Sequence, residues 1–226
     1  MSSGKLLIVG TPIGNIEDIT LRALRALREA DCVAAEDTRH TGQLLTRYEI
    51  RKPLVSYHEF NEAKRTPELL AKLRAGQRIA LVSDAGMPTL SDPGLRLIAA
   101  AVADEQAVEV VPGISAITTA LAGSGLPVQP FLFYGFLPHK SAQREKILRQ
   151  LTPLPFALVF FESPYRLVKT VAALQSICGD RRVVVGRELT KKFEETIRGT
   201  PEAVLKRLEN RTVKGEITLI IEAAKK

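Results

Sequence analysis

The sequence has few of the residues that build disulfide frameworks, metal sites or membrane spans. It contains two cysteines, three histidines and no tryptophan among its 226 residues. Cys32 and Cys178 form no CxxC pair, and no histidine lies at ligand spacing from either, which argues against a disulfide scaffold and a metal site. The longest uninterrupted apolar run covers residues 97–103, whereas a membrane-spanning helix needs about 18–20 residues. We therefore expect a soluble, cytoplasmic protein with no metal and no membrane span.

Charge is distributed unevenly between the two halves of the chain. Residues 1–120 carry 14 basic and 15 acidic side chains, a net charge of −1, whereas residues 121–226 carry 18 and 10, a net charge of +8, which together give the +7 of the whole chain. A near-neutral half joined to a strongly basic half indicates that the second half meets a polyanion. A solvated basic surface would produce the same counts, so charge alone leaves both interpretations open.

Short apolar runs alternate with helical patterns in the first half. Leu21, Leu24 and Leu27 recur at helical spacing, and so do Leu69 and Leu73. The expected strands cover residues 5–10, 32–35, 54–56, 78–83 and 108–111. Alternation of this kind is typical of a mostly parallel sheet covered by helices.

A break in this pattern separates the two halves. Residues 123–130 contain two glycines and two prolines, as linkers do. The strands expected beyond it cover residues 131–136, 156–161, 182–188, 193–198 and 216–221, and the helices 141–151, 165–177 and 201–209. Three strands follow one another near the end with a single helix among them, which predicts a mixed sheet. The sequence thus predicts two tandem α/β domains, residues 1–122 and 131–226, joined by a linker at 123–130.

Ligands of parallel sheets bind beyond the carboxyl ends of the strands, so the loops there are candidate sites. Residues 10–15 match neither GxGxxG nor a P-loop, which disfavours dinucleotide and ATP sites of those types. In residues 83–94, Asp92 and Pro93 fit a helix N-cap followed by proline at the first helical position. Asp84 lies at a strand end close to a glycine, and we interpret it as a ligand-binding residue.

Charged motifs follow other expected strands. The Glu36-Asp37 pair followed by Arg39 fits either catalysis or a helix start capped by Asp37. His58 lies between two aromatic residues, and we interpret it as packed or hydrogen-bonded rather than as a base. Residues 187–195 are densely charged around an aromatic ring, which is typical of a nucleic-acid surface or of a solvated loop.

Taken in order, residues 10–15, 36–39, 83–94, 112–116, 187–191 and 215–216 resemble the motifs of the tetrapyrrole-methylase superfamily of S-adenosyl-L-methionine enzymes. Residues 36–39 together with 83–94 are most similar to its RNA-modifying branch, which methylates the 2′-hydroxyl of a cytidine in small-subunit (16S) ribosomal RNA. The resemblance extends from Leu6 to about Glu222. It implies two α/β domains with S-adenosyl-L-methionine as cofactor in the cleft between them, and a homodimer. Longer relatives continue into a C-terminal helical extension, whereas this sequence stops at Lys226, so it is either a short member or a chain whose tail has been left out.

The resemblance also implies roles for individual residues. Glu36, Asp37 and Arg39 would position or activate the substrate, and Lys191 joins Glu36 and Asp37 as a candidate to accept the proton of the ribose hydroxyl. Phe60 and Tyr165 stand where relatives often carry histidine, so neither position holds an obligatory histidine base. The cofactor would contact Pro12, Ile13, Asp84, Gly86, Met87, Ser115, Ala116, Phe161, Glu162 and Thr218.

The implied partner is small-subunit ribosomal RNA, either free or in the assembled small ribosomal subunit. Residues of the basic half expected to contact RNA are Lys140, Arg144, Arg166, Arg181, Arg182, Lys191 and Lys192. Two alternatives stay open, namely a relative that methylates a tetrapyrrole or a protein side chain, and a non-catalytic RNA-binding protein of the same fold. The pattern at residues 36–39 favours RNA methylation.

Overall fold

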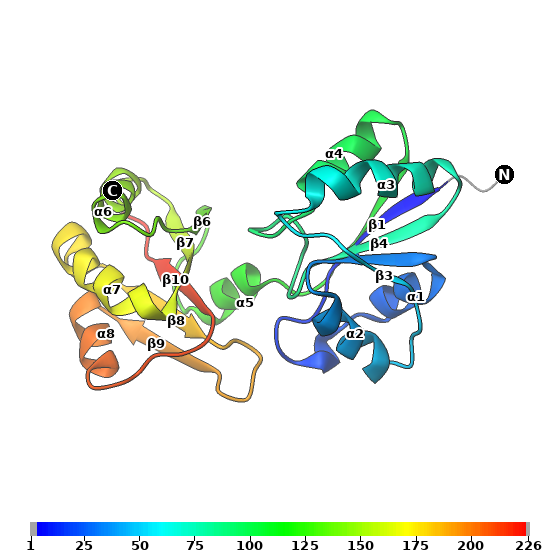
Figure 1. Cartoon of the computed structure of the whole chain (residues 1–226). Helices are drawn as coiled ribbons and strands as arrows, with labels where there is room; N and C mark the ends of the chain where they lie inside the picture. The colour runs from blue at the N-terminus through cyan, green and yellow to red at the C-terminus, as the bar shows by residue number, and fades with distance from the viewer. Residues whose placement is uncertain (1–3, 225–226) are drawn as a thin grey trace. The chain divides into compact units, whose positions relative to one another are not determined.

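The computed structural model describes residues 4–224. The chain divides into two compact units, Met1–Ser115 and Ala116–Lys226, each with one β-sheet and its own helices (Figure 1). The division falls ahead of helix α5 (Ala116–Gly123), whereas the sequence analysis assigned residues up to 122 to the first domain. Helix α5 packs on strand β10 (Ile217–Ile221) of the second unit. A short apolar helix carries no sequence signal for which of two sheets it covers.

All five strands of the first unit are parallel and lie in the order β3-β2-β4-β1-β5. They are β1 (Lys5–Val9), β2 (Cys32–Ala35), β3 (Leu54–Ser56), β4 (Arg78–Val82) and β5 (Ala107–Val111). The helices are α1 (Leu21–Glu29), α2 (Thr38–Arg47), α3 (Glu62–Arg74) and α4 (Leu95–Ala103), with a 3-10 turn at Ile16–Asp18. The predicted parallel sheet is confirmed, and each strand begins and ends within one residue of its expected position.

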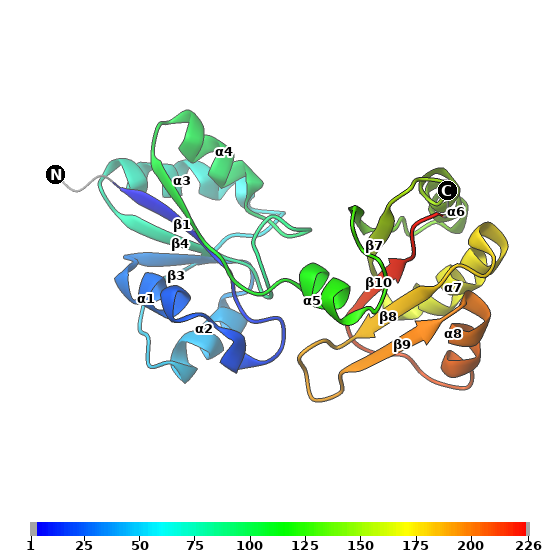
Figure 2. The ribbon, with the colours of Figure 1, turned by 180° about the vertical axis from the view of Figure 1, so that it is seen from behind.

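Helices cover both faces of this sheet. Successive strand residues point to opposite faces, so Leu7 and Val9 of β1 pack with α1 and α2, whereas Leu6 packs with α3 and α4. Figures 1 and 2 show the two helix pairs on opposite sides of the sheet. Because both faces of the sheet are buried, the strands are continuous apolar runs in the sequence. Because the strands are parallel, the loops that follow them all start at one edge.

Helix α4 begins later than the sequence predicted. Asp92 was expected to cap the helix with Pro93 at its first position, but α4 begins at Leu95 and its N-cap is Gly94, with a φ of 132°. The carboxylate of Glu62, at the start of α3, accepts a hydrogen bond from the Gly94 N–H at 2.8 Å. The prediction for Asp92 was wrong because a side chain from another helix binds the backbone at this helix start.

The second unit has a mixed sheet, as predicted, in the order β6-β7-β10-β8-β9. Strands β6 and β7 pair in parallel, and the remaining pairs are antiparallel. The strands before β10 are β6 (Phe131–Phe136), β7 (Ala157–Glu162), β8 (Val183–Arg187) and β9 (Glu195–Gly199). The helices after α5 are α6 (Ser141–Leu151), α7 (Pro164–Cys178) and α8 (Pro201–Leu208).

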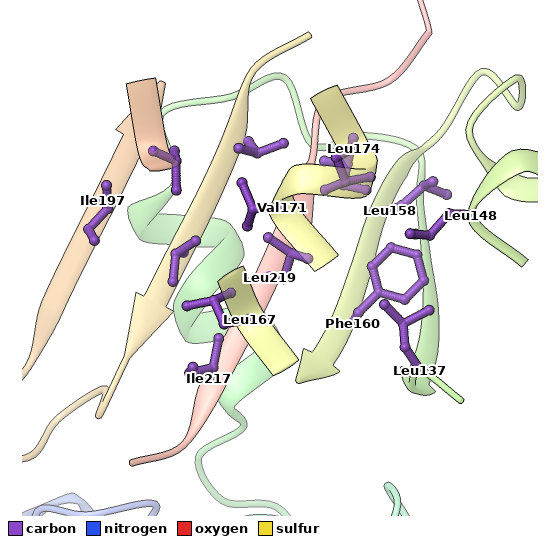
Figure 3. Packing of buried hydrophobic residues seen from close by; sticks show 14 of the residues in the cluster. Leu137, Leu148, Leu158, Phe160, Leu167, Val171, Leu174, Ile197, Ile217 and Leu219 are labelled. Atoms are coloured by element: carbon purple, nitrogen blue, oxygen red, sulfur yellow. The ribbon is translucent and has the colours of Figure 1, made fainter. Parts of the chain in front are cut away.

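Helices α6, α7 and α8 share one face of this sheet, and their core contains Leu158 and Phe160 of β7, Leu167 and Val171 of α7, and Leu219 of β10 (Figure 3). Helix α5 lies on the other face, behind the strands in that view. Within residues 4–224, no helix combines the length and hydropathy that crossing a bilayer requires. The same residues contain no group of three or more His, Cys, Asp or Glu side chains that could hold a metal ion.

Candidate functional site

Hydrogen bonds join three loops at the carboxyl edge of the first sheet. Thr11, after β1, and Gly86, after β4, exchange two backbone hydrogen bonds of 2.9 and 3.1 Å. The Thr11 hydroxyl also donates to the carbonyl oxygen of Ser83 at 3.2 Å. The Gly10 N–H donates to the carbonyl oxygen of Val111 at 3.0 Å, which ties the first loop to the end of β5. These contacts hold the three loops in one fixed arrangement.

Glycine is required where these loops touch. A Cβ on Gly10 would lie 2.7 Å from Cα of Gly113 and 2.6 Å from Sδ of Met87. Gly86 has a φ of 81°, a left-handed conformation that favours glycine, and a Cβ there would meet Cγ2 of Ile13 at 3.4 Å. The structure therefore brings the predicted cofactor residues Ile13, Gly86 and Met87 together on the first unit.

Asp84 links this edge to the loop after β2. Its Oδ1 accepts a hydrogen bond from the backbone N–H of Asp37 at 3.0 Å. The residue is half-buried and follows β4, where the sequence analysis expected a ligand-binding carboxylate. An ionised carboxylate has about four acceptor sites. The contact with Asp37 therefore leaves Asp84 able to accept hydrogen bonds from a ligand.

The acidic pair after β2 occupies two different environments. Oδ1 of Asp37 accepts from the backbone N–H of Arg39 at 2.8 Å, and Oδ2 lies 2.7 Å from Nη2 of the same arginine. These bonds hold the pKa of Asp37 well below its usual range, and the capping interpretation of Asp37 is confirmed. Burial, with a smaller contribution from the charge of Asp84, raises the pKa of Glu36. Glu36 is therefore the stronger proton acceptor of the two.

A pocket of about 400 Å³ opens between the loops that follow β2 and β3. Phe60 is 92% exposed. The His58 ring packs edge-on against Phe60, which agrees with the interpretation of His58 as packed, and its buried Nδ1 has no hydrogen-bond partner within the described residues. In the sequence, residues 36–39 and His58 carry separate signals, because spacing alone does not show that β2 and β3 are neighbours. The lining residues are Glu36, Asp37, Thr38, Arg39, Ser56, His58, Glu59 and Phe60.

Two predicted cofactor residues of the second unit are cross-strand neighbours. Thr218 of β10 pairs with Phe161 of β7, on the face of the sheet away from α6, α7 and α8. The Phe161 ring packs against Phe133 and Phe136, with ring centroids 5.0 and 5.4 Å apart. Ala116 is the first residue of α5, which covers this face. The structure thus groups Ala116, Phe161 and Thr218 on one side of the second sheet.

Glu162 points to the opposite face and binds helix α7. Its side chain is fully buried, and Oε1 accepts from the Ser163 N–H at 2.7 Å and lies 2.8 Å from Nη2 of Arg166. Oε2 accepts from the Thr170 hydroxyl at 2.7 Å. Both oxygens therefore stabilise the junction between β7 and α7. The cofactor contact that the resemblance implies at Glu162 would therefore have to be made by its backbone atoms. Thr170 could not be predicted from the sequence, because no motif connects it to a carboxylate eight residues earlier.

Lys191 lies between two carboxylates. Its Nζ is 2.9 Å from Oε1 of Glu188 and 2.9 Å from Oε2 of Glu216. Burial alone would lower the pKa of Lys191, but the hydrogen bonds to Glu216 and Glu188 outweigh it and raise the pKa. A lysine of this kind stays protonated near neutral pH. Its environment therefore disfavours the predicted role as a proton acceptor.

The basic residues predicted to contact RNA differ in exposure. Arg144 is 2% exposed, and its guanidinium donates to the carbonyl oxygens of the loop before α6. The prediction was wrong for Arg144, because a buried guanidinium that binds main-chain carbonyls is not available to phosphates. Arg181 likewise donates to the carbonyl oxygens of Thr152 and Glu222. The exposed members of the predicted set are Lys140, Arg182 and Lys192.

The sequence matches a known protein family over most of its length. The model of the family "Tetrapyrrole (Corrin/Porphyrin) Methylases" matches residues 5–204. The chain belongs to the tetrapyrrole methylase family. A relative from Thermotoga maritima, named ribosomal RNA small subunit methyltransferase I, is 48% identical over 218 residues, which are 96% of this chain and 98% of that relative. A relative of the same name from Bacillus subtilis is 45% identical over 221 residues, 98% of this chain and 76% of the relative.

Solved structures of tetrapyrrole methylases and related enzymes have the same fold. Uroporphyrin-III-C-methyltransferase from Thermus thermophilus has a TM-score of 0.66 and 24% identity, and the match covers 97% of this chain and 94% of that one. A diphthine synthase has a TM-score of 0.71 and 15% identity, with 97% and 90% covered. At these identities the similarity shows the fold alone. The predicted fold class, with a parallel first sheet and a mixed second sheet, is confirmed.

Proposed function

We propose that this protein is an S-adenosyl-L-methionine-dependent methyltransferase that methylates small-subunit ribosomal RNA at the 2′-hydroxyl of a cytidine. The observation that carries the proposal is the 48% identity to the Thermotoga maritima relative, which spans 96% of this chain and 98% of that protein. The name of that relative gives ribosomal RNA as its substrate. The choice of a cytidine 2′-hydroxyl rests on the resemblance of residues 36–39 and 83–94 to the RNA-modifying branch.

The first unit has groups that suit S-adenosyl-L-methionine. The half-buried carboxylate of Asp84 can accept hydrogen bonds from the two ribose hydroxyls of this ligand. Pro12 and Ile13 are buried apolar residues of the loop after β1, while Gly86 and Met87 belong to the loop bonded to Thr11. We assign these four residues and Asp84 to cofactor binding.

Further cofactor contacts are proposed for the second unit and its first helix. Thr218 offers a hydroxyl and Phe161 an aromatic ring on the same face of the sheet. Ser115 and Ala116 lie at the start of α5, where backbone N–H groups can bind polar ligand atoms. For Glu162 we assign the backbone alone, since both side-chain oxygens bind within the unit.

Bound S-adenosyl-L-methionine supplies the methyl group of its sulfonium, and the remainder of the cofactor is a neutral thioether after the transfer. The protein has to align the ribose hydroxyl and exclude water, and positioning of this kind supplies roughly 7–11 kcal/mol of a barrier. A group that accepts the hydroxyl proton adds about 10²–10⁴-fold. Asp37 and Lys191 are held in their charged forms by ion-pair partners, so we assign them to positioning. Arg39, whose side chain is 88% exposed, is suited to hold an RNA phosphate at the pocket rim.

A tetrapyrrole is the second candidate substrate, because the family model is named for tetrapyrrole methylases. Tetrapyrrole substrates of these enzymes carry several carboxylates. The pocket on the first unit is lined by three carboxylates, those of Glu36, Asp37 and Glu59, against the one arginine, Arg39, that neutralises Asp37. Such a lining repels carboxylates that a tetrapyrrole would bring into the pocket itself, whereas the base and ribose of a nucleoside carry no charge there. This observation favours RNA over a tetrapyrrole.

The proposed partner is the small ribosomal subunit or its free RNA in the cytoplasm, and the proposed assembly is a homodimer. Exposed Lys140 and Lys192 supply positive charge on the second unit for phosphate contacts, whereas exposed Arg182 is ion-paired with Glu222. Phe193, 66% exposed, lies beside Lys192, whose Nζ is 5.7 Å from the centre of the ring. An aromatic ring next to basic side chains suits single-stranded RNA.

Calorimetric titration with S-adenosyl-L-methionine and its demethylated product tests the cofactor site. We expect micromolar binding that Asp84→Ala abolishes. Asp84→Asn keeps an acceptor for the Asp37 N–H, so we expect a folded protein with weakened binding. The control Glu202→Gln removes an exposed carboxylate of α8 and leaves the affinity unchanged. Absence of binding by the wild type would contradict the proposal.

Transfer of labelled methyl groups distinguishes the candidate functions. The acceptors are small ribosomal subunits, their deproteinised RNA, and a reduced tetrapyrrole. Label in the RNA extracted from the subunits, or in the deproteinised RNA, supports the proposal. Label in the tetrapyrrole alone supports the second candidate, and cofactor binding with no transfer to any RNA indicates a non-catalytic RNA-binding protein.

A further inference from the structure

The pocket between the β2 and β3 loops has an aromatic ring at its rim that core packing does not explain. Phe60 is 92% exposed, and its ring meets that of His58 edge-on, with 6.1 Å between the ring centroids. A phenylalanine stabilises a fold by being buried, which this one is not. An exposed ring on the wall of a pocket is suited to stack on a flat ligand.

The other wall of the pocket adjoins the loop assigned to the cofactor. The carboxyl group of Glu36 interacts electrostatically with the charge of Asp84 and is hydrogen-bonded to the backbone of Asp84. The Asp37 N–H donates to Oδ1 of Asp84 at 3.0 Å. In the sheet order, β2 lies between β3 and β4. The pocket is lined by the loops after β2 and β3 alone, with Glu36 on the side that adjoins the loop after β4 and Phe60 in the loop after β3.

A nucleoside consists of a flat base joined to a ribose. The base matches the aromatic ring of Phe60, and the ribose matches the carboxylate of Glu36. Proteins recognise single-stranded RNA by turning bases out and stacking them on aromatic side chains. With the base on Phe60, the ribose lies toward Glu36 and the loop of Asp84. The pocket volume of about 400 Å³ falls in the roughly 300–1,000 Å³ range of small-molecule sites.

We propose that this pocket receives the target nucleoside turned out of the RNA, with Phe60 stacked on its base and Glu36 accepting the proton of its 2′-hydroxyl. The inference rests on the proposed function and specifies its substrate site. The O–H bond breaks, and the proton bonds to a carboxylate oxygen of Glu36. The electron pair left on the ribose oxygen forms the bond to the methyl carbon, and the pair of the broken carbon–sulfur bond leaves on the neutral thioether. Burial raises the pKa of Glu36 and so makes it a better proton acceptor than an ordinary carboxylate.

Three variants separate the stacking role from the proton-accepting role. Phe60→Ala is expected to raise KM for small ribosomal subunits by roughly 5- to 150-fold with kcat retained, and Phe60→Trp to restore KM. Glu36→Gln is expected to lower the single-turnover rate by about 10²–10⁴-fold with KM retained. The Kd for S-adenosyl-L-methionine stays unchanged in all three variants. The control Leu21→Ala, which removes an apolar side chain of α1 that is 86% exposed, changes none of these quantities.

Three results would overturn the inference. A wild-type KM in Phe60→Ala means that the base does not stack there. A wild-type rate in Glu36→Gln means that Glu36 does not accept the proton. A lost affinity for S-adenosyl-L-methionine in a folded Phe60→Ala protein means that the pocket belongs to the cofactor. If the wild type itself transfers methyl groups to no RNA, the proposed function fails as well, and that failure is visible before any substitution is made.

Discussion

Replacing Gly10 by alanine tests whether the contact between the loops after β1 and β5 shapes the cofactor site. The added Cβ would lie 2.7 Å from both Cα and N of Gly113. Because ordinary contact begins at 3.4 Å, the two loops would have to separate by about 0.7 Å. The side chain of Met87, 2.6 Å from the new Cβ, can rotate away. The atoms of Gly113 belong to the main chain, so the loop must move as a whole.

Overpacking of this kind destabilises a protein by about 1–3 kcal/mol. We expect Gly10→Ala to lose this much free energy of unfolding, measured by urea denaturation followed by circular dichroism. Hydrogen exchange in β1 and β4 assigns the loss to the first unit. The shift also moves Thr11 and Pro12 relative to Asp84. A displacement approaching 1 Å weakens oriented contacts by up to about 10²-fold, so we expect the Kd for S-adenosyl-L-methionine to rise between about 10- and 100-fold.

Gly42→Ala is the matched control in the same unit. Gly42 lies inside helix α2, and a Cβ there would meet Cδ1 of Leu54 at 3.5 Å, an ordinary contact. Alanine in a helix interior is more stable than glycine by about 0.5–1 kcal/mol, so this variant is expected to gain stability and keep its affinity. The reasoning is refuted if Gly10→Ala is as stable as the wild type and binds the cofactor as tightly.

Three further predictions concern charged side chains. Glu162→Ala leaves a guanidinium and a hydroxyl of α7 without their carboxylate and is expected to cost about 3–5 kcal/mol in thermal denaturation; an unchanged melting temperature would contradict it. Folding raises the pKa of Glu36 above its ordinary value of 4.5 through burial and the charge of Asp84, so it favours the protonated form. The difference in free energy of unfolding between the wild type and Glu36→Gln should therefore stay constant at pH values below 4.5. As the pH rises above that value, the wild type should become less stable relative to the variant; a difference that does not change with pH would refute this. Affinity for small-subunit RNA should fall steeply with salt, and in filter binding Lys192→Ala should reduce the slope by about one while buried Arg144→Lys leaves it unchanged.

Most of the fold could be predicted because each element carries its own local signal. Buried strands are short apolar runs, and the residues beyond them break the pattern with Gly, Pro and polar side chains. This is why the sequence located all ten strands, and helix α6 (Ser141–Leu151) to the residue. The order of strands within each sheet follows from long-range packing, and no local signal carries it.

The sequence predicted the individual loops of the candidate site but not how they come together. The motif at residues 36–39 was found, but its place in one pocket with Phe60 depends on β2 and β3 being neighbours. Arg144 was misjudged for a similar reason, and the side-chain contacts of Glu162 could not be foreseen. A sequence pattern suggests a function for a charged residue, but the role of that residue depends on its partners in the fold. Thr170, for example, lies on α7 and binds Glu162 of β7, and Arg144 binds a main-chain carbonyl. The start of α4 was misplaced because Glu62, from another helix, binds its first backbone N–H.

The measurement we would make first is nucleoside mass spectrometry of small-subunit RNA methylated by the purified protein with a deuterated methyl donor. The proposal predicts the label in 2′-O-methylcytidine at one position of the RNA, and its disappearance in the Asp84→Ala variant. Label on a nucleobase, on the ribose of another nucleoside, or on a ribosomal protein would contradict it.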